Sequence, residues 1–215
     1  MSKIIKKIHQ IWDKNEYPAD FKQHQLSLIK NHQDWQYTLW DLTKCRDLIE
    51  KRYNYFLNTF DNYKYNIEKI DAARFFILDY EGGFYTDIDI FFYKNVEELF
   101  LNKKAVLFNR KCDRYICNSV MYNNNSIFFK KLCKQLMHLQ KLFYDKNEND
   151  IINVLNLNGQ HFLYNFYNIK SYDCTLLDSK YFEFYKNIVN YKNEDFIYGI
   201  HEYVNSWFDK NKVLV

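Results

Sequence analysis

In the first half of the chain, segments in which apolar and polar residues alternate are followed by segments in which apolar residues recur every three to four positions. The first pattern predicts a strand, and the second predicts an amphipathic helix. Asp41 stands where it can cap a helix N-terminus, and Gly82 stands where a helix can end. The predicted elements are strands at residues 4–12 and 35–40 and helices at residues 20–31, 42–51 and 64–81.

Beyond Gly82 the pattern predicts more strands and a helix that Ser126 can cap. The predicted elements are strands at residues 84–93, 105–109, 117–122 and 196–200 and helices at residues 126–144, 151–157 and 159–167. Alternating strands and helices indicate an α/β fold with ligands at the carboxyl ends of its strands. One proline, four glycines and no linker-like tract predict a single domain over residues 1–215.

The most informative segment is a double glycine followed by two carboxylates, Gly82-Gly83-Phe84-Tyr85-Thr86-Asp87-Ile88-Asp89. Asp87 and Asp89 are two residues apart, so in an extended chain both project from the same side. Two carboxylates aimed at one point repel each other unless a cation lies between them. Carboxylate oxygens suit Mn²⁺ or Mg²⁺, and such an ion can neutralise a departing nucleoside diphosphate.

A bare Asp-x-Asp is a weak motif, because a solvated pair at a strand end has the same sequence. Here the helix before the double glycine adds Asp71 and Arg74, which are three residues apart and share a helix face. The apolar residues around Asp87 and Asp89 also place the carboxylates inside the fold. The whole set therefore favours a functional site over a solvated strand end.

This set resembles the glycosyltransferase family whose hallmark is a sugar-binding region with a DXD motif. The family includes yeast-type initiating mannosyltransferases, bacterial capsular transferases and, more distantly, the glucosylating clostridial toxins. Its pattern is a helix with S-D-x-x-R-Y followed by G-G-x-Y-x-D-x-D, although Ile70 stands here in place of the Ser. Further resemblance lies in Lys6–Trp12, Tyr37–Asp41, Asn118–Met121 and His201–Trp207.

The resemblance implies a GT-A-like, Rossmann-like nucleotide-sugar-binding domain with a mixed central sheet. It also implies Mn²⁺ or Mg²⁺ as cofactor and transfer with retention of anomeric configuration. The implied catalytic residues are Asp71, Arg74, Asp87 and Asp89, and the implied metal ligands are Asp89, Asp87 and His201. The implied donor-binding residues are Trp12, Tyr85, Asp71, Arg74, Asp87, Asn118, Ser206 and Trp207.

Several of these roles have a structural alternative. Trp12 can be a core residue of its strand, Asn118 is one of many asparagines, and either His201 or Ser206 can complete the metal or phosphate site. For His9, which lies on an otherwise apolar strand, the structural role is the favoured prediction.

Charge, cysteine spacing and hydropathy argue against three classes: nucleic-acid-binding, disulfide-rich and membrane-spanning proteins. The net charge is only +3, from 30 basic and 27 acidic residues, which argues against a nucleic-acid-binding protein. The five cysteines show no CxxC spacing, so we expect reduced, buried thiols rather than a disulfide framework. No signal-peptide core and no run of about 18 apolar residues is present, which predicts a soluble cytoplasmic protein without a membrane span.

The sequence thus predicts a retaining, metal-dependent hexosyltransferase. Its donor would be a nucleotide sugar, with a UDP-sugar favoured and GDP-mannose possible, and its acceptor would be a hydroxyl on a glycan, protein or lipid. The alternative is a non-catalytic nucleotide-sugar-binding or glycan-binding module of the same fold, which would not hydrolyse the donor.

Overall fold

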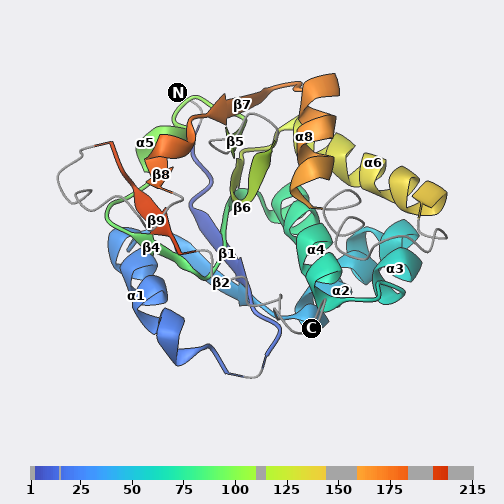
Figure 1. Cartoon of the computed structure of the whole chain (residues 1–215), viewed down its shortest axis with the longest axis horizontal. Coiled ribbons are helices and arrows are strands. Elements are labelled where there is room, and N and C mark those ends of the chain that lie inside the picture. The colour runs from blue at the N-terminus through green and yellow to red at the C-terminus, as the bar shows by residue number, and fades with distance from the viewer. Residues whose placement is uncertain (1–2, 15, 110–114, 144–158, 184–195, 203–215) are drawn as a thin grey trace.

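The computed structural model describes residues 3–14, 16–109, 115–143, 159–183 and 196–202 (Figure 1). The strands are β1 Lys7–Ile11, β2 Gln36–Trp40, β3 Gly83–Thr86, β4 Ile90–Phe92, β5 Ala105–Asn109, β6 Ile116–Asn123, β7 Cys174–Leu177, β8 Phe182–Glu183 and β9 Gly199–His201. The α-helices are α1 Lys22–Asn31, α2 Leu42–Arg52, α3 Asn54–Asp61, α4 Asn66–Glu81, α5 Glu97–Phe100, α6 Ile127–Phe143 and α8 Gln160–Ile169. Short 3-10 turns are η1 Ala19–Phe21 and η2 Ser179–Tyr181.

The central sheet has six strands in the order β2-β1-β3-β6-β5-β7. β1 is parallel to both β2 and β3, and β5 is parallel to β7, whereas β6 runs antiparallel to β3 and β5. The predicted α/β fold with a mixed central sheet is therefore confirmed. A second sheet of three strands, β4-β9-β8, was not predicted from the sequence.

Two hydrophobic cores lie on the two faces of the central sheet. One is formed under α2, α3, α4, α6 and α8, and the other under α1, α5 and the small sheet, as the two sides of Figure 1 show. Neighbouring residues of β3 divide between them, since Phe84 packs into the second core and Tyr85 into the first. β3 is thus covered on both faces, which explains its nearly continuous apolar sequence.

Local capping signals predicted the helix starts well. The Asp41 side chain accepts a hydrogen bond from the Lys44 N–H at 2.8 Å, and the Ser126 hydroxyl accepts one from the Phe128 N–H at 3.0 Å. α4 ends before Gly82, whose φ of 65° lies in the left-handed region. The helix predicted at residues 151–157 lies outside the described residues.

The single strand predicted at residues 84–93 is wrong. β3 ends at Thr86, and β4 begins at Ile90 in the other sheet, so Asp87 and Asp89 lie in the connecting turn rather than on one face of an extended strand. The cause is pairing with distant segments, because β3 pairs with β1 and β6 whereas β4 pairs with β9. The helix α3 and the strands β7 and β8 were also missed.

Gly83 is expected to be intolerant of a side chain. Its φ is 86°, and a Cβ there would lie 2.5 Å from the carbonyl oxygen of Lys7 on β1. Gly83→Ala should lower the free energy of unfolding by on the order of 1–3 kcal/mol, measured by urea denaturation. Gly159→Ala is the control, since Gly159 has an ordinary φ of −90°. Equal stability of the two variants would contradict the prediction.

The described cysteines, Cys45, Cys117, Cys133 and Cys174, are free and buried, as expected, and Cys112 lies outside the described residues. Within the described ranges, no helix combines the length and the apolar character that a membrane crossing demands.

Candidate active site

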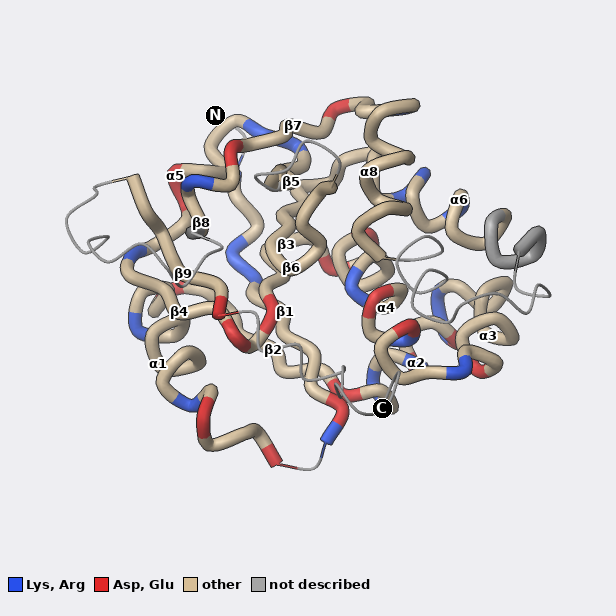
Figure 2. Tube along the Cα trace, viewed as in Figure 1, with Lys and Arg blue, Asp and Glu red and all other residues tan. Residues whose placement is uncertain are grey.

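The carboxylate turn lies where the central sheet meets the small sheet. β1 and β3 are parallel, with Ile8 paired with Phe84 and His9 with Tyr85, so the turn after β3 emerges at the carboxyl edge where β1 also ends. Figure 2 shows the acidic positions of the β3–β4 connection close to β1 near the centre of the view. This is the edge at which α/β folds bind ligands.

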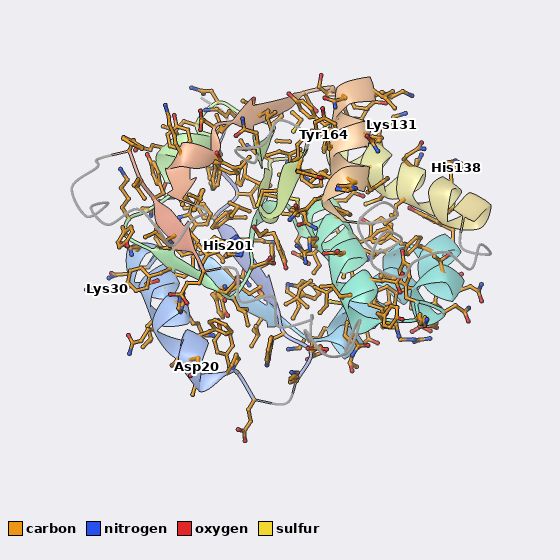
Figure 3. The ribbon with its side chains drawn as sticks, in the orientation of Figure 1. Asp20, Lys30, Lys131, His138, Tyr164 and His201 are labelled. Carbon is orange, nitrogen blue, oxygen red and sulfur yellow. The ribbon has the colours of Figure 1, made fainter. Side chains whose placement is uncertain are left out.

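Three possible metal ligands converge at the turn. Ligand atoms of Asp87, Asp89 and His201 all lie within 4.8 Å of one another. His201, labelled in Figure 3, ends β9, and the antiparallel pairing of β9 with β4 places it opposite Ile90. Two carboxylate oxygens and one imidazole nitrogen fit a divalent cation, so the donor set agrees with the predicted metal site.

His201 and Asp89 form a close pair within this cluster. The His201 Nε2 lies 3.0 Å from Oδ1 of Asp89. Burial acts to lower the pKa of His201, but its hydrogen bonds with Asp89 and Cys117 outweigh that effect and raise the pKa to about 10. A cation bound at this nitrogen would displace the proton, so cation binding and proton release are coupled here.

A buried ion pair on α4 stands next to the turn. Arg74 Nη2 lies 2.8 Å from Asp71 Oδ1, and Arg74 Nη1 donates to the Asn118 carbonyl at 2.8 Å. The same Nη1 lies 3.5 Å from Asp87 Oδ1, and the Asn118 amide donates to Asp71 at 3.1 Å. Burial raises the pKa of Asp71, against the opposing effects of Arg74 and Asn118. Hydrogen bonds to the remaining polar atoms help to offset the desolvation cost of such a pair. Both Nη atoms of Arg74 have partners, whereas its Nε is buried without a hydrogen-bond partner among the described residues. The carboxylates of Asp87 and Asp71 nonetheless keep Arg74 charged.

Tyr85 connects this ion pair to the turn. Its hydroxyl donates to Asp87 Oδ1 at 2.7 Å, and the Arg74 guanidinium lies 5.0 Å above its ring centroid. The Tyr85 side chain is almost fully buried. Tyr85 and Arg74 therefore both contact Oδ1 of Asp87 and orient its carboxylate.

The structure brings together most of the residues predicted for the site, whereas two of them lie outside the described residues. The residues brought together are Asp71, Arg74, Tyr85, Asp87, Asp89, Asn118 and His201. Trp12 is half-buried just after β1 at the same edge, with its indole N–H donating to the Glu16 carbonyl at 2.7 Å. Ser206 and Trp207 lie outside the described residues, so their predicted roles stay predictions.

His9 has the structural role that the sequence favoured. Its Nε2 lies 2.9 Å from the Gly82 carbonyl, and the Trp40 indole N–H donates to its Nδ1 at 3.2 Å. Burial lowers the pKa of His9 to about 4, so the ring is neutral. A neutral ring with both nitrogens engaged ties β1 to Gly82 and Trp40.

Two residues that hold the turn, Ser119 and Gln10, lie in segments of family resemblance but were given no role in the site from the sequence. The Ser119 carbonyl accepts from the Asp87 N–H at 2.9 Å, and its hydroxyl lies 3.4 Å from Nδ1 of His201. Gln10 donates its side-chain N–H to the Asp87 carbonyl at 3.1 Å. The available signal was a polar side chain inside a largely buried strand, because such a side chain needs a hydrogen-bond partner.

Known proteins are similar to this chain over the segment that contains the carboxylate turn. Residues 18–106 match a family model described as a glycosyltransferase sugar-binding region containing a DXD motif. The mannosyl phosphorylinositol ceramide synthase SUR1 of Saccharomyces cerevisiae is 34% identical over 147 residues, which cover 66% of this chain and 37% of that protein. Inositol phosphoceramide mannosyltransferase 3 of Schizosaccharomyces pombe is 44% identical over 87 residues, which cover 40% of this chain and 24% of that protein.

Among solved structures, mouse xyloside xylosyltransferase 1 superposes with a TM-score of 0.55 and 12% identity, covering 92% of this chain and 97% of that one. This likeness shows a shared GT-A-like fold. The family resemblance inferred from the sequence motifs is confirmed, and the matched stretch contains the DXD segment. The chain spans little more than a third of the first of the curated relatives and less of the second.

Proposed function

We propose that this chain, whose residues 18–106 carry the DXD-containing sugar-binding region of glycosyltransferases, is one catalytic domain of a metal-dependent hexosyltransferase. The observation that carries the proposal is the convergence of Asp87, Asp89 and His201 within 4.8 Å, beside the buried Asp71–Arg74 pair. A solvated strand end has no reason to bury an arginine against two carboxylates.

Each residue of the cluster has a role that follows from its contacts. Asp89, Asp87 and His201 would hold Mn²⁺ or Mg²⁺, and the bound cation would supply positive charge for the departing nucleoside diphosphate. Arg74 is a fixed cation in a buried setting, where its field on a nearby phosphate is stronger than in water. Asp71, oriented by Arg74 and the Asn118 amide, would accept hydrogen bonds from hydroxyls of the donor sugar.

Retention of anomeric configuration belongs to the same proposal. The acceptor hydroxyl would approach the face from which the diphosphate leaves, and the leaving phosphate would assist it. Trp12, which is half-buried at the carboxyl edge, would lie near the nucleobase. Ser206 and Trp207 are proposed to contact the diphosphate on the strength of the sequence resemblance alone.

The donor and acceptor follow from two different arguments. The sequence favoured a UDP-hexose, whereas the names of the two curated relatives describe mannosyl transfer to an inositol phosphoceramide. We therefore propose GDP-mannose as a donor of equal standing with UDP-hexoses. A hydroxyl of a phosphoinositol headgroup is the proposed acceptor.

The test is a screen of nucleotide sugars for cation-dependent hydrolysis. With Mn²⁺, we expect the chain to release nucleoside diphosphate from one donor class, and excess EDTA should abolish that release because the three ligands then lose their cation. Re-addition of Mn²⁺ after EDTA is the control for irreversible damage. Saturable binding of a nucleotide sugar without hydrolysis or transfer would support the non-catalytic module instead.

A further inference from the structure

A buried glutamine lies directly behind the carboxylate turn. Gln10 is on β1, its exposed fraction is 0%, and its Nε2 donates to the backbone carbonyl of Asp87 at 3.1 Å. The Thr86 hydroxyl also donates to this oxygen, at 3.3 Å, but Thr86 is the adjacent residue and moves together with the turn. Gln10 reaches the same oxygen from a different strand and can therefore anchor it.

Hydrogen bonds to both the oxygen and the nitrogen of the Gln10 side-chain amide fix its orientation. Its Oε1 accepts from the Tyr37 hydroxyl at 2.9 Å and from the Tyr17 hydroxyl at 3.5 Å. Turning the amide around would set its oxygen against the Asp87 carbonyl, so that two acceptors would face each other. The amide thus has one favourable direction, with its donor aimed at the turn.

A chain of donors supports that direction. The Gln25 side-chain amide on α1 donates to the Tyr37 hydroxyl at 2.9 Å, and Lys22 Nζ donates to Oε1 of the same Gln25 side chain at 2.9 Å. Because Tyr37 receives a hydrogen bond from Gln25, its own single proton is directed to Gln10. Buried polar chains of this kind polarise one another and hold one geometry. These hydrogen bonds link Lys22, at the exposed start of α1, to the Asp87 carbonyl.

The backbone of the turn is held at three points, by residues on β6 and β1 and by the residue that follows β9. The Asp87 N–H donates to Ser119 on β6 at 2.9 Å, and the Asp89 carbonyl accepts from the Glu202 N–H at 3.0 Å. The third point is the Asp87 carbonyl, held by Gln10. Of these three, the Gln10 contact is made by a side chain, so substitution can remove it without altering any backbone.

We propose that Gln10 is a positioning residue for the cation-binding cluster. It fixes the rigid peptide plane between Asp87 and Ile88. That plane sets the direction in which the chain continues to Asp89, and hence the placement of its carboxylate relative to that of Asp87. The proposal rests on the proposed function insofar as the cluster formed with His201 binds a cation.

The test compares Gln10→Met with Asn124→Leu in the full chain. Both changes replace a buried amide that donates to one backbone carbonyl at 3.1 Å with an apolar side chain of similar size, and Asn124 bonds Lys3, outside the candidate site. Hydrogen exchange of residues 87–89 is measured in the cation-free chain, and Mn²⁺ affinity by calorimetric titration. Gln10→Met should speed exchange in the turn and weaken Mn²⁺ binding about 10–100-fold, the usual effect of removing a partner of a metal ligand. Asn124→Leu should leave both unchanged.

Turn exchange and Mn²⁺ affinity in Gln10→Met that match those of Asn124→Leu would overturn the proposal. If the wild-type chain binds no Mn²⁺, the cation part of the proposed function fails, and the turn exchange alone decides the role of Gln10. Should Gln10→Met not fold, Tyr37→Phe carries the test with the same two readouts. That variant keeps the Gln10 donor but removes the hydroxyl that directs it, so a smaller change of the same sign is expected.

Discussion

Asp89→Asn is expected to lower the rate of donor hydrolysis by about 10²–10³, the usual cost of losing one group that stabilises charge in the transition state. The change keeps the size of the side chain but removes the charge that lies 3.0 Å from His201 Nε2 and within the three-ligand cluster. Because the turn backbone is held by other contacts, the chain should remain folded. The measurement is kcat/KM in Mn²⁺ together with the melting temperature.

Asp34→Asn is the matched control for this variant. Asp34 is exposed and forms an ion pair with Lys6 at 2.6 Å, so it shares the chemistry of the substitution but is not part of the site. Its activity and melting temperature should remain near those of the wild type, since exposed pairs contribute little to stability. Donor hydrolysis near the wild-type rate in Asp89→Asn would remove Asp89 from the metal site.

Arg74→Lys should lower kcat/KM by about 10–100-fold, although the charge is conserved. The planar guanidinium contacts Asp71, the Asn118 carbonyl and Asp87 at once, and a lysine ammonium cannot reproduce that fork. Loss of one charge-assisted hydrogen bond costs about 1.5–3 kcal/mol, which corresponds to this range of rate. Melting and turnover are to be measured on the same preparation.

Arg46→Lys is the control, because Arg46 also makes two hydrogen bonds to one carboxylate, that of Asp61, but on the exposed surface. It should change neither kcat/KM nor melting by much. If Arg74→Lys melts far below the wild type and yet the folded fraction turns over normally, Arg74 is a structural residue and its catalytic assignment is wrong.

The parts of the fold that follow from short-range chemistry could be predicted from the sequence. Asp41 and Ser126 act as helix caps through bonds to residues two or three positions away, and Gly82 ends α4 by its own backbone freedom. The helical face shared by Asp71 and Arg74 is likewise a local property, and the two side chains do form an ion pair.

The parts that depend on distant partners could not be predicted. Residues 84–93 have strand-forming apolar and aromatic residues on both sides of the two carboxylates, so nothing local reveals that β3 and β4 join different sheets. Asp87 and Asp89 do converge, but through a turn rather than through the period of a strand. The contact of Gln10 with Asp87 spans 77 positions and depends on the register of β1 against β3. No local pattern specifies that register.

The Asp87–Asp89 turn connects the large sheet to the small one. Asp87 follows the last strand position of the large sheet, whereas Asp89 and His201 stand at the border of the small one. A cation held by all three side chains would link the large sheet to the small sheet. The geometry of the cation site then depends on how closely β9 packs against β4 within the small sheet, because His201 ends β9 and Asp89 precedes β4. Gly199 permits this close packing, since a Cβ there would lie 2.6 Å from the Phe91 carbonyl. Changes in the small sheet that touch no ligand would therefore alter the affinity of the site for its cation.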